Sequence, residues 1–143
     1  MQRRLDGVLA STTRWFAAAF TINHPVHDPL TSRRLSGTWC AFGGAVDSRL
    51  PDSGVRDADA HIIVTTRPTT GTQVAYGGAC LFDSGYPLQS QPGSAYSPPR
   101  PVVGQVNLSP RLLGGDEAEW EGGARVEAVL STTVHETLHA LGF

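Results

Sequence analysis

The sequence is poor in charge, in sulfur and in long apolar runs. Charged residues make up 17% of its 143 residues, every basic residue is an arginine, and the formal net charge is −2. This balance excludes the broad basic surface of a nucleic-acid-binding protein and the acidic tail of a disordered one. No run approaches 18 apolar residues, so no segment is expected to cross a membrane. The apolar stretch at residues 5–20 contains Asp6 and Arg14 and lacks a small-residue cleavage site, so we expect no signal peptide.

Sulfur is limited to one methionine and two cysteines, Cys40 and Cys80. The two cysteines could form one disulfide, which would indicate an exported protein, or they could be two buried thiols. What the chain does contain is enough for one domain, since 40% of it is hydrophobic. Its 16 glycines and 10 prolines indicate that much of the chain lies in turns and loops.

The apolar pattern predicts two long helices with strands between them. Residues 3–22 and 124–141 are expected to be helices, because apolar side chains recur in both at three- and four-residue spacing. The clearest strand is a β-branched run at residues 61–66. Weaker strands are expected at residues 72–79 and 102–108.

The second predicted helix contains the pattern H-E-x-x-H. Positions i and i+4 share a helix face, so His135 and His139 can reach one metal ion. The helix also has an apolar arc, formed by Val126, Val129, Leu130, Val134, Leu138 and Leu141. At about 100° per residue, the histidine pair lies roughly 140° from the centre of this arc. The arc is therefore expected to pack on the sheet while the histidines face a cleft.

These residue types, in this order, are typical of a catalytic zinc site. Zinc binds neutral imidazole nitrogens, lowers the pKa of a bound water and polarises a substrate carbonyl. Glu136 follows the first histidine and can act as the general base for that water. Gly142 can adopt the positive φ that the turn after a helix requires. The alternative interpretation is a chance match on a solvated helix face, because the motif fixes only three positions.

Two further segments accompany the helix motif. Residues 134–143 read V-H-E-T-L-H-A-L-G-F, residues 57–64 read D-A-D-A-H-I-I-V, and residues 100–110 read R-P-V-V-G-Q-V-N-L-S-P. In this order and spacing they are similar to the zinc helix, the D-A-D-F strand and the R-P-x-x-G-x-x-N segment of one family. The chain thus resembles the leishmanolysin-like metallopeptidases, a branch of the metzincins, over roughly residues 31–143.

The resemblance implies an α+β, zincin-like (metzincin-like) fold, in which a twisted mixed sheet is accompanied by two long helices and the second helix carries the zinc motif. Residues 1–143 would form a single partial catalytic domain that ends just after this helix. The implied metal is one Zn²⁺ ion held by His135 and His139, with Glu136 as general base and Gly142 as the turn residue. The resemblance also implies that Cys40 and Cys80 form a disulfide.

The implied activity is a zinc-dependent metalloendopeptidase that hydrolyses peptide bonds through a metal-activated water. Its partners would be protein or peptide substrates, bound extended along a sheet edge, and not nucleic acid. Intact members of the family are secreted or lie at the cell surface. Membrane association would require parts outside this chain.

The chain departs from the family pattern in its zinc ligands. The family's third ligand is a histidine far downstream of the glycine and is followed by a methionine turn. Here the other histidines, His24, His27 and His61, lie upstream, and the methionine is Met1. We therefore expect the 143-residue chain alone to be inactive. The alternatives are a non-catalytic homologue that acts as a surface or adhesion protein, and a zincin of another type with a glutamate as third ligand.

Overall fold

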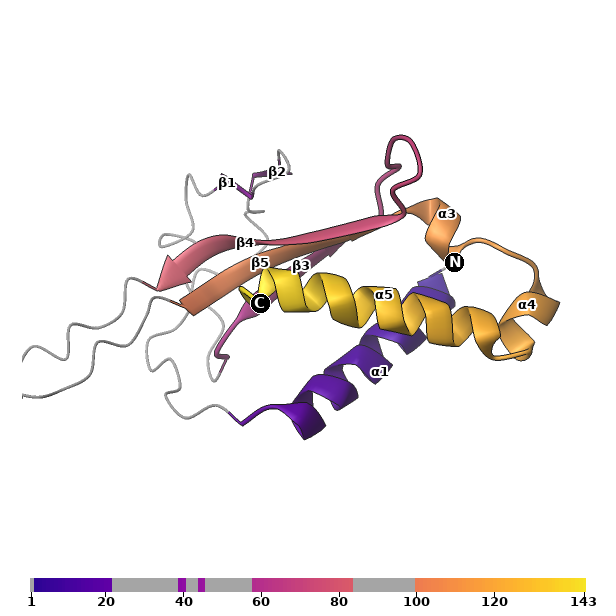
Figure 1. Cartoon of the computed structure of the whole chain (residues 1–143), viewed down its shortest axis with the longest axis horizontal. Helices are drawn as coiled ribbons and strands as arrows, with labels where there is room; N and C mark the ends of the chain where they lie inside the picture. The colour runs from indigo at the N-terminus through magenta and orange to yellow at the C-terminus, as the bar shows by residue number, and fades with distance from the viewer. Residues whose placement is uncertain (1, 22–38, 41–43, 46–57, 84–99) are drawn as a thin grey trace, which may run out of the picture.

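A computed structural model describes residues 2–21, 39–40, 44–45, 58–83 and 100–143 (Figure 1). Two long helices and a three-stranded sheet form its main part. The elements in chain order are α1 (Gln2–Ala19), β1 (Trp39–Cys40), β2 (Gly44–Ala45), β3 (His61–Thr65), β4 (Ala75–Asp83), β5 (Arg100–Leu108), α3 (Pro110–Leu113), α4 (Glu117–Glu121) and α5 (Ala124–Ala140). The α+β class expected from the sequence is therefore confirmed.

The sheet is mixed and has the strand order β3-β5-β4. The central strand β5 pairs in parallel with β3 and antiparallel with β4. In the register, Val106 of β5 lies opposite Val64 on one side and Gly77 on the other. The pairing of β4 with β5 is irregular between Ala79 and Leu81. A separate antiparallel pair, β1 with β2, lies near β4.

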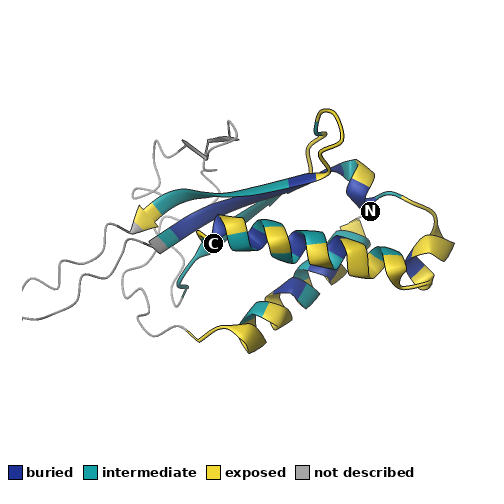
Figure 2. Cartoon of the chain, in the orientation of Figure 1, coloured by how far each residue is buried: buried dark blue, intermediate teal, exposed yellow. Residues whose placement is uncertain are grey.

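Both long helices lie on the same face of the sheet (Figures 1 and 2). Helix α5 contacts β4 and β5, and α1 packs against α5. Between the helices and the sheet lies the apolar core, whose buried members are Val8, Ala75, Val106, Leu108, Leu112, Leu113, Trp120, Val129 and Ala140. Burial of these side chains supplies most of the free energy that holds α1 and α5 on the sheet.

Glycines in the sheet allow α5 to come unusually close. A Cβ at Gly77 of β4 would overlap the main-chain carbonyl of Glu136. A Cβ at Gly104 of β5 would lie 2.7 Å from the Cβ of Ala140. Such separations do not occur between real side-chain and backbone atoms, so glycine is required at both positions. These two glycines therefore determine the distance between the sheet and α5, the helix that carries the H-E-x-x-H motif.

The buried face of α5 differs from the predicted one. Its buried residues are Val129, Thr133, Thr137 and Ala140. Of the expected arc, only Val129 is buried, Val126 is exposed, and the other four residues are half-buried. Both threonines satisfy their hydroxyls within the helix, by donating to the carbonyls of Val129 and Thr133 at 2.7 Å. Small side chains fit this interface because the glycines below bring the backbone so close.

The short helices α3 and α4 bring the chain from β5 to the start of α5. Asp116 caps α4 by accepting a hydrogen bond from the Glu119 backbone at 2.9 Å. Arg4 of α1 contacts this region, since its guanidinium is 2.7 Å from the Glu117 carboxylate and lies over the Trp120 ring. The N-terminal end of α1 is thereby fixed to the segment that precedes the motif helix.

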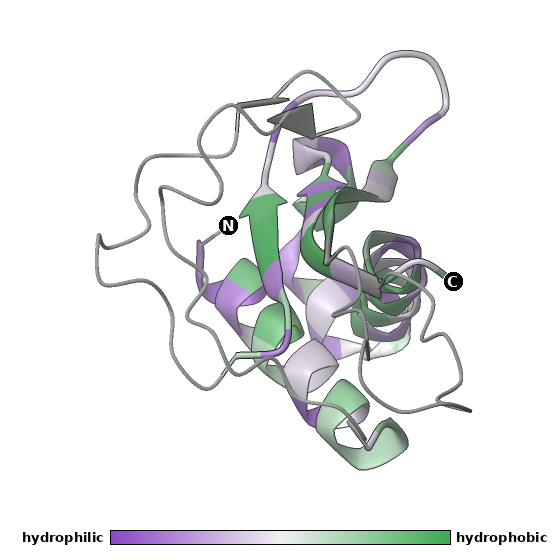
Figure 3. Cartoon of the chain, turned by 90° about the vertical axis from the view of Figure 1, so that its left-hand side faces the viewer, coloured by the Kyte–Doolittle hydropathy of each residue, from purple (hydrophilic) through white to green (hydrophobic). Residues whose placement is uncertain are grey.

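No described helix is long and apolar enough to cross a membrane. Both long helices carry hydrophilic as well as hydrophobic residues (Figure 3).

Candidate metal centre

His135 and His139 lie side by side on the exposed face of α5. The two Nε2 atoms are 3.1 Å apart, and the rings meet edge to face with centroids 4.6 Å apart. Both residues are exposed, because the helix turns its opposite side towards the sheet. The structure therefore brings together the two histidines that the motif singled out.

The separation of these nitrogens suits a shared metal ion. Two nitrogens bound to one tetrahedral zinc at 2.0–2.1 Å are about 3.3–3.4 Å apart. The observed 3.1 Å differs from this by a few tenths of an ångström, which a small ring rotation removes. The donor set is also chemically suitable, since imidazole is a common zinc ligand.

A main-chain oxygen orients the second histidine. The Nδ1 atom of His139 is 3.0 Å from the main-chain oxygen of Phe143. That oxygen can only accept a hydrogen bond, so Nδ1 carries the proton and donates it. In the neutral imidazole, the Nε2 atom of His139 is then unprotonated and has a lone pair available for a metal ion. A hydrogen bond of this kind is the usual way in which proteins orient a metal-binding imidazole.

Gly142 makes this contact geometrically possible. Its φ is 90°, and the helix ends there with two hydrogen bonds, from Gly142 N to His139 O at 3.1 Å and from Phe143 N to Leu138 O at 3.0 Å. This pair of bonds is the Schellman arrangement, which needs a left-handed residue after the helix. The turn folds the Phe143 oxygen back over the last turn of α5.

Glu136 lies on the side of α5 that faces β4. It is half-buried, and its main-chain carbonyl lies over Gly77. Along the helix it follows His135 directly and is thus about 100° around the axis from it. Glu136 therefore lies on the side of the helix between the exposed histidine face and the face that packs on the sheet.

The described residues supply two candidate ligands and no third. Among them, no group of three histidine, cysteine or acidic side chains could hold a metal ion. His61 belongs to β3, the strand farthest from β4 in the sheet, and burial lowers its pKa. His24, His27 and Met1 lie outside the residues that the structure describes.

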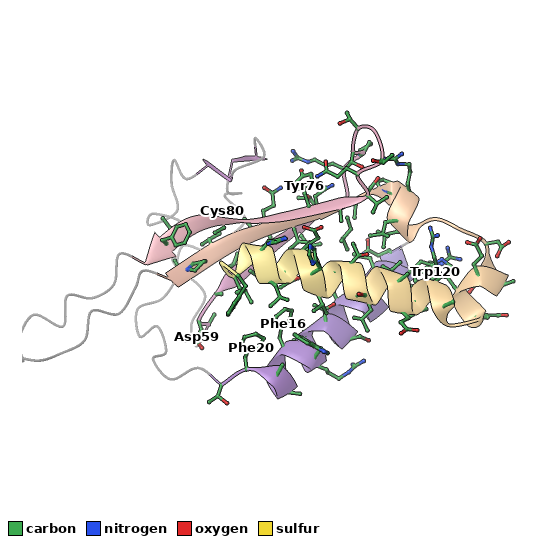
Figure 4. All side chains as sticks on the ribbon, viewed as in Figure 1. Phe16, Phe20, Asp59, Tyr76, Cys80 and Trp120 are labelled. Atoms are coloured by element: carbon green, nitrogen blue, oxygen red, sulfur yellow. The ribbon has the colours of Figure 1, made fainter. Side chains whose placement is uncertain are left out.

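The two cysteines lie on neighbouring strands. Cys80 belongs to β4 (Figure 4), and Cys40 belongs to β1, which lies near β4. The side chain of Cys40 is outside the part that the structure describes, so the disulfide stays a prediction.

Sequence reasoning did not identify two contributors to this centre. One is Gly77, and its only signal was the Gly77-Gly78 pair inside a weak strand pattern. The other is the main-chain oxygen of Phe143, for which side-chain patterns contain no signal.

Two known proteins are similar in sequence to part of this chain. Leishmanolysin-like peptidases of Drosophila pseudoobscura pseudoobscura and Drosophila melanogaster are each 30% identical to it over 97 residues. The match covers 65% of this chain and 12% of each relative, so the chain corresponds to a small part of their length. No protein-family model matches the chain, and no solved structure matches it significantly. The resemblance inferred from the motifs is thus confirmed: the chain is distantly similar to leishmanolysin-like peptidases.

Proposed function

We propose that the chain carries the metal-binding helix of a zinc-dependent metalloendopeptidase with a metzincin-like fold. The observation that carries this proposal is the 3.1 Å separation of the His135 and His139 Nε2 atoms on an exposed helix face. The distant similarity to leishmanolysin-like peptidases supports it. His135 and His139 would hold the zinc ion, and a third ligand would come from outside the described residues.

Each group near the pair has a distinct role in this proposal. When bound, zinc would acidify a water molecule and polarise the substrate carbonyl. Glu136 would accept the proton of the attacking water at its carboxylate and pass it to the departing amine. The main-chain oxygen of Phe143 keeps the Nε2 lone pair of His139 available by accepting its Nδ1 proton. Gly142 supports this contact through its left-handed conformation.

We place the substrate along β4. This strand is at one edge of the three-stranded sheet and has β5 as its partner there. The outer side of an edge strand presents N–H and C=O groups that an extended peptide can pair with. Residues 75–79 of β4 lie before the irregular pairing, and Glu136 lies over Gly77 in this segment. A peptide paired there would run close to Glu136.

A non-catalytic homologue that acts through its surface is the second candidate. The observation in its favour is that the described residues supply two ligands, whereas catalytic zinc sites use three. Peptidase assays separate the two candidates. We expect negligible cleavage by the 143-residue chain and chelator-sensitive cleavage by the longest natural product that contains it. Absence of cleavage by that product, when loaded with zinc, would favour the non-catalytic candidate.

A further inference from the structure

The exposed histidine pair is half of a complete zinc coordination shell. Zinc is four-coordinate in closed protein sites, and the pair supplies two nitrogens. Because both rings are exposed, the remaining coordination positions of an ion bound to them would be open on the exposed side of α5. Any donor that fills them must therefore reach α5 from its exposed side.

The surface beside the pair permits a close approach. Ser131 and Ala128 lie one and two turns before His135 on the same helix face, and both are exposed and small. Further towards the helix start, Glu127 is exposed in the first turn of α5. Arg125 is turned away from this surface, since its guanidinium donates to the main-chain oxygens of Arg111 and Leu112. Helices approach most closely where such small side chains meet.

We propose that zinc joins two copies of this chain through His135 and His139 of each, and that the resulting four-nitrogen site is closed. The proposal rests on the proposed zinc binding and adds a form of regulation to it. Two copies related by a twofold axis present the same pair to each other, so one ion satisfies both. A second copy is the occupant that supplies imidazole donors with the same spacing.

A zinc ion bound by four imidazoles in this way would be catalytically inactive. A catalytic zinc site needs a free position for water or substrate, and four imidazoles leave none. In the zinc-bridged dimer, each copy would also cover the side of the other copy's α5 that carries the histidines. Peptidase chemistry would then require the monomer, in which a third ligand from elsewhere leaves one position free.

The test measures molar mass during a zinc titration of the metal-stripped 143-residue chain, by light scattering after gel filtration. We expect the mass to rise from 15.2 kDa to twice that value as zinc reaches half an equivalent. A large excess of zinc should reverse the rise, because each chain then binds its own ion. X-ray absorption at half an equivalent should detect four nitrogen ligands of the imidazole type.

Three variants make the test specific. The double variant His135→Ala/His139→Ala should stay monomeric at every zinc level. Ser131→Arg should bind zinc but lose the doubling, because it adds bulk and like charges next to the pair. Thr13→Arg, an equivalent change on the exposed surface of α1, should dimerise like the parent. Circular dichroism of each variant checks that it folds.

The negative results separate the two proposals. A monomer that binds one zinc ion through the histidines would overturn the bridged pair and leave the proposed zinc site intact. Zinc-dependent doubling that persists in the double variant would overturn the bridging by these residues. Absence of any zinc binding would overturn both the bridging and the metal role of the motif.

Discussion

Gly77 of β4 lies directly beneath the main-chain carbonyl of Glu136, with no room for a side chain between the strand and the helix. This contact determines how close α5 is to the sheet and hence where its exposed histidines lie. It also places the candidate general base over the strand that we propose as the substrate-binding edge.

Replacement of Gly77 by alanine should destabilise the fold. We expect Gly77→Ala to lower the free energy of unfolding by about 3 kcal/mol, because backbone atoms would have to move to admit the methyl group. Gly7→Ala is the matched control, since Gly7 lies within α1 and a Cβ there meets nothing within 4 Å. The control should gain about 0.5–1 kcal/mol from helix propensity. Urea denaturation measures both, and equal stability of the two variants would refute the close contact.

The sequence predicted the long elements well because their periodic patterns extend over many residues. The predicted helix at 124–141 is α5, and the predicted strands at 61–66 and 102–108 are β3 and β5 with shifts of one or two residues at their ends. The helix predicted over 3–22 ends at Ala19, since apolar spacing continues past the last helical residue. The strand predicted at 72–79 lies at Ala75–Asp83. Its two glycines interrupt the alternation of apolar and polar residues by which a strand is recognised.

The buried face of α5 could not be predicted from hydrophobicity. The apolar arc from Val126 to Leu141 suggested one face, whereas Thr133 and Thr137 are buried instead. Which face of α5 is buried depends on Gly77 and Gly104. They are distant from the helix in sequence, and their lack of a side chain lets the helix backbone lie close to the sheet. The histidine pair was identified correctly as lying on one face, because the i, i+4 relationship is a local property of any helix.

Glu136 is the residue whose removal should separate catalysis from metal binding. In the longest natural product that contains this chain, Glu136→Gln should lower the peptidase rate at least about 100-fold, the usual contribution of a general base. Zinc content should not change, because the carboxylate is not one of the proposed ligands. Glu127→Gln, an exposed change in the first turn of α5, is the control and should retain the parent rate. Retained activity of Glu136→Gln would remove this residue from the role of base.

Cys40 and Cys80 should be joined in protein recovered from an oxidising compartment. The strands that carry them, β1 and β4, lie near each other. Mass spectrometry of a non-reduced digest should find one peptide pair that separates on reduction. A bond that closes a loop of this length stabilises a fold by about 4 kcal/mol in the chain-entropy model. Two alkylatable thiols in the folded protein would contradict the pairing.

The pKa of His61 should make stability depend on pH. Burial lowers its pKa below the usual 6.5, so the unfolded chain binds this proton more readily than the folded one. Stability is therefore complete above about pH 6.5 and falls as the pH drops towards the folded-state pKa. His61→Gln should reduce the loss in denaturation midpoint between about pH 7.5 and pH 5.5. His135→Gln, at an exposed position, should keep it, and an equal loss in all three proteins would exclude His61 as the cause.

The most direct test of the proposed metal centre is a competitive zinc titration of the 143-residue chain, its His139→Ala variant and a His61→Ala control. We predict weak but measurable zinc affinity for the parent and the control, and a loss of at least about 10-fold in His139→Ala, because removal of one of two imidazoles eliminates chelation. The same zinc affinity in His139→Ala as in the parent would contradict the assignment of this helix as the metal-binding helix.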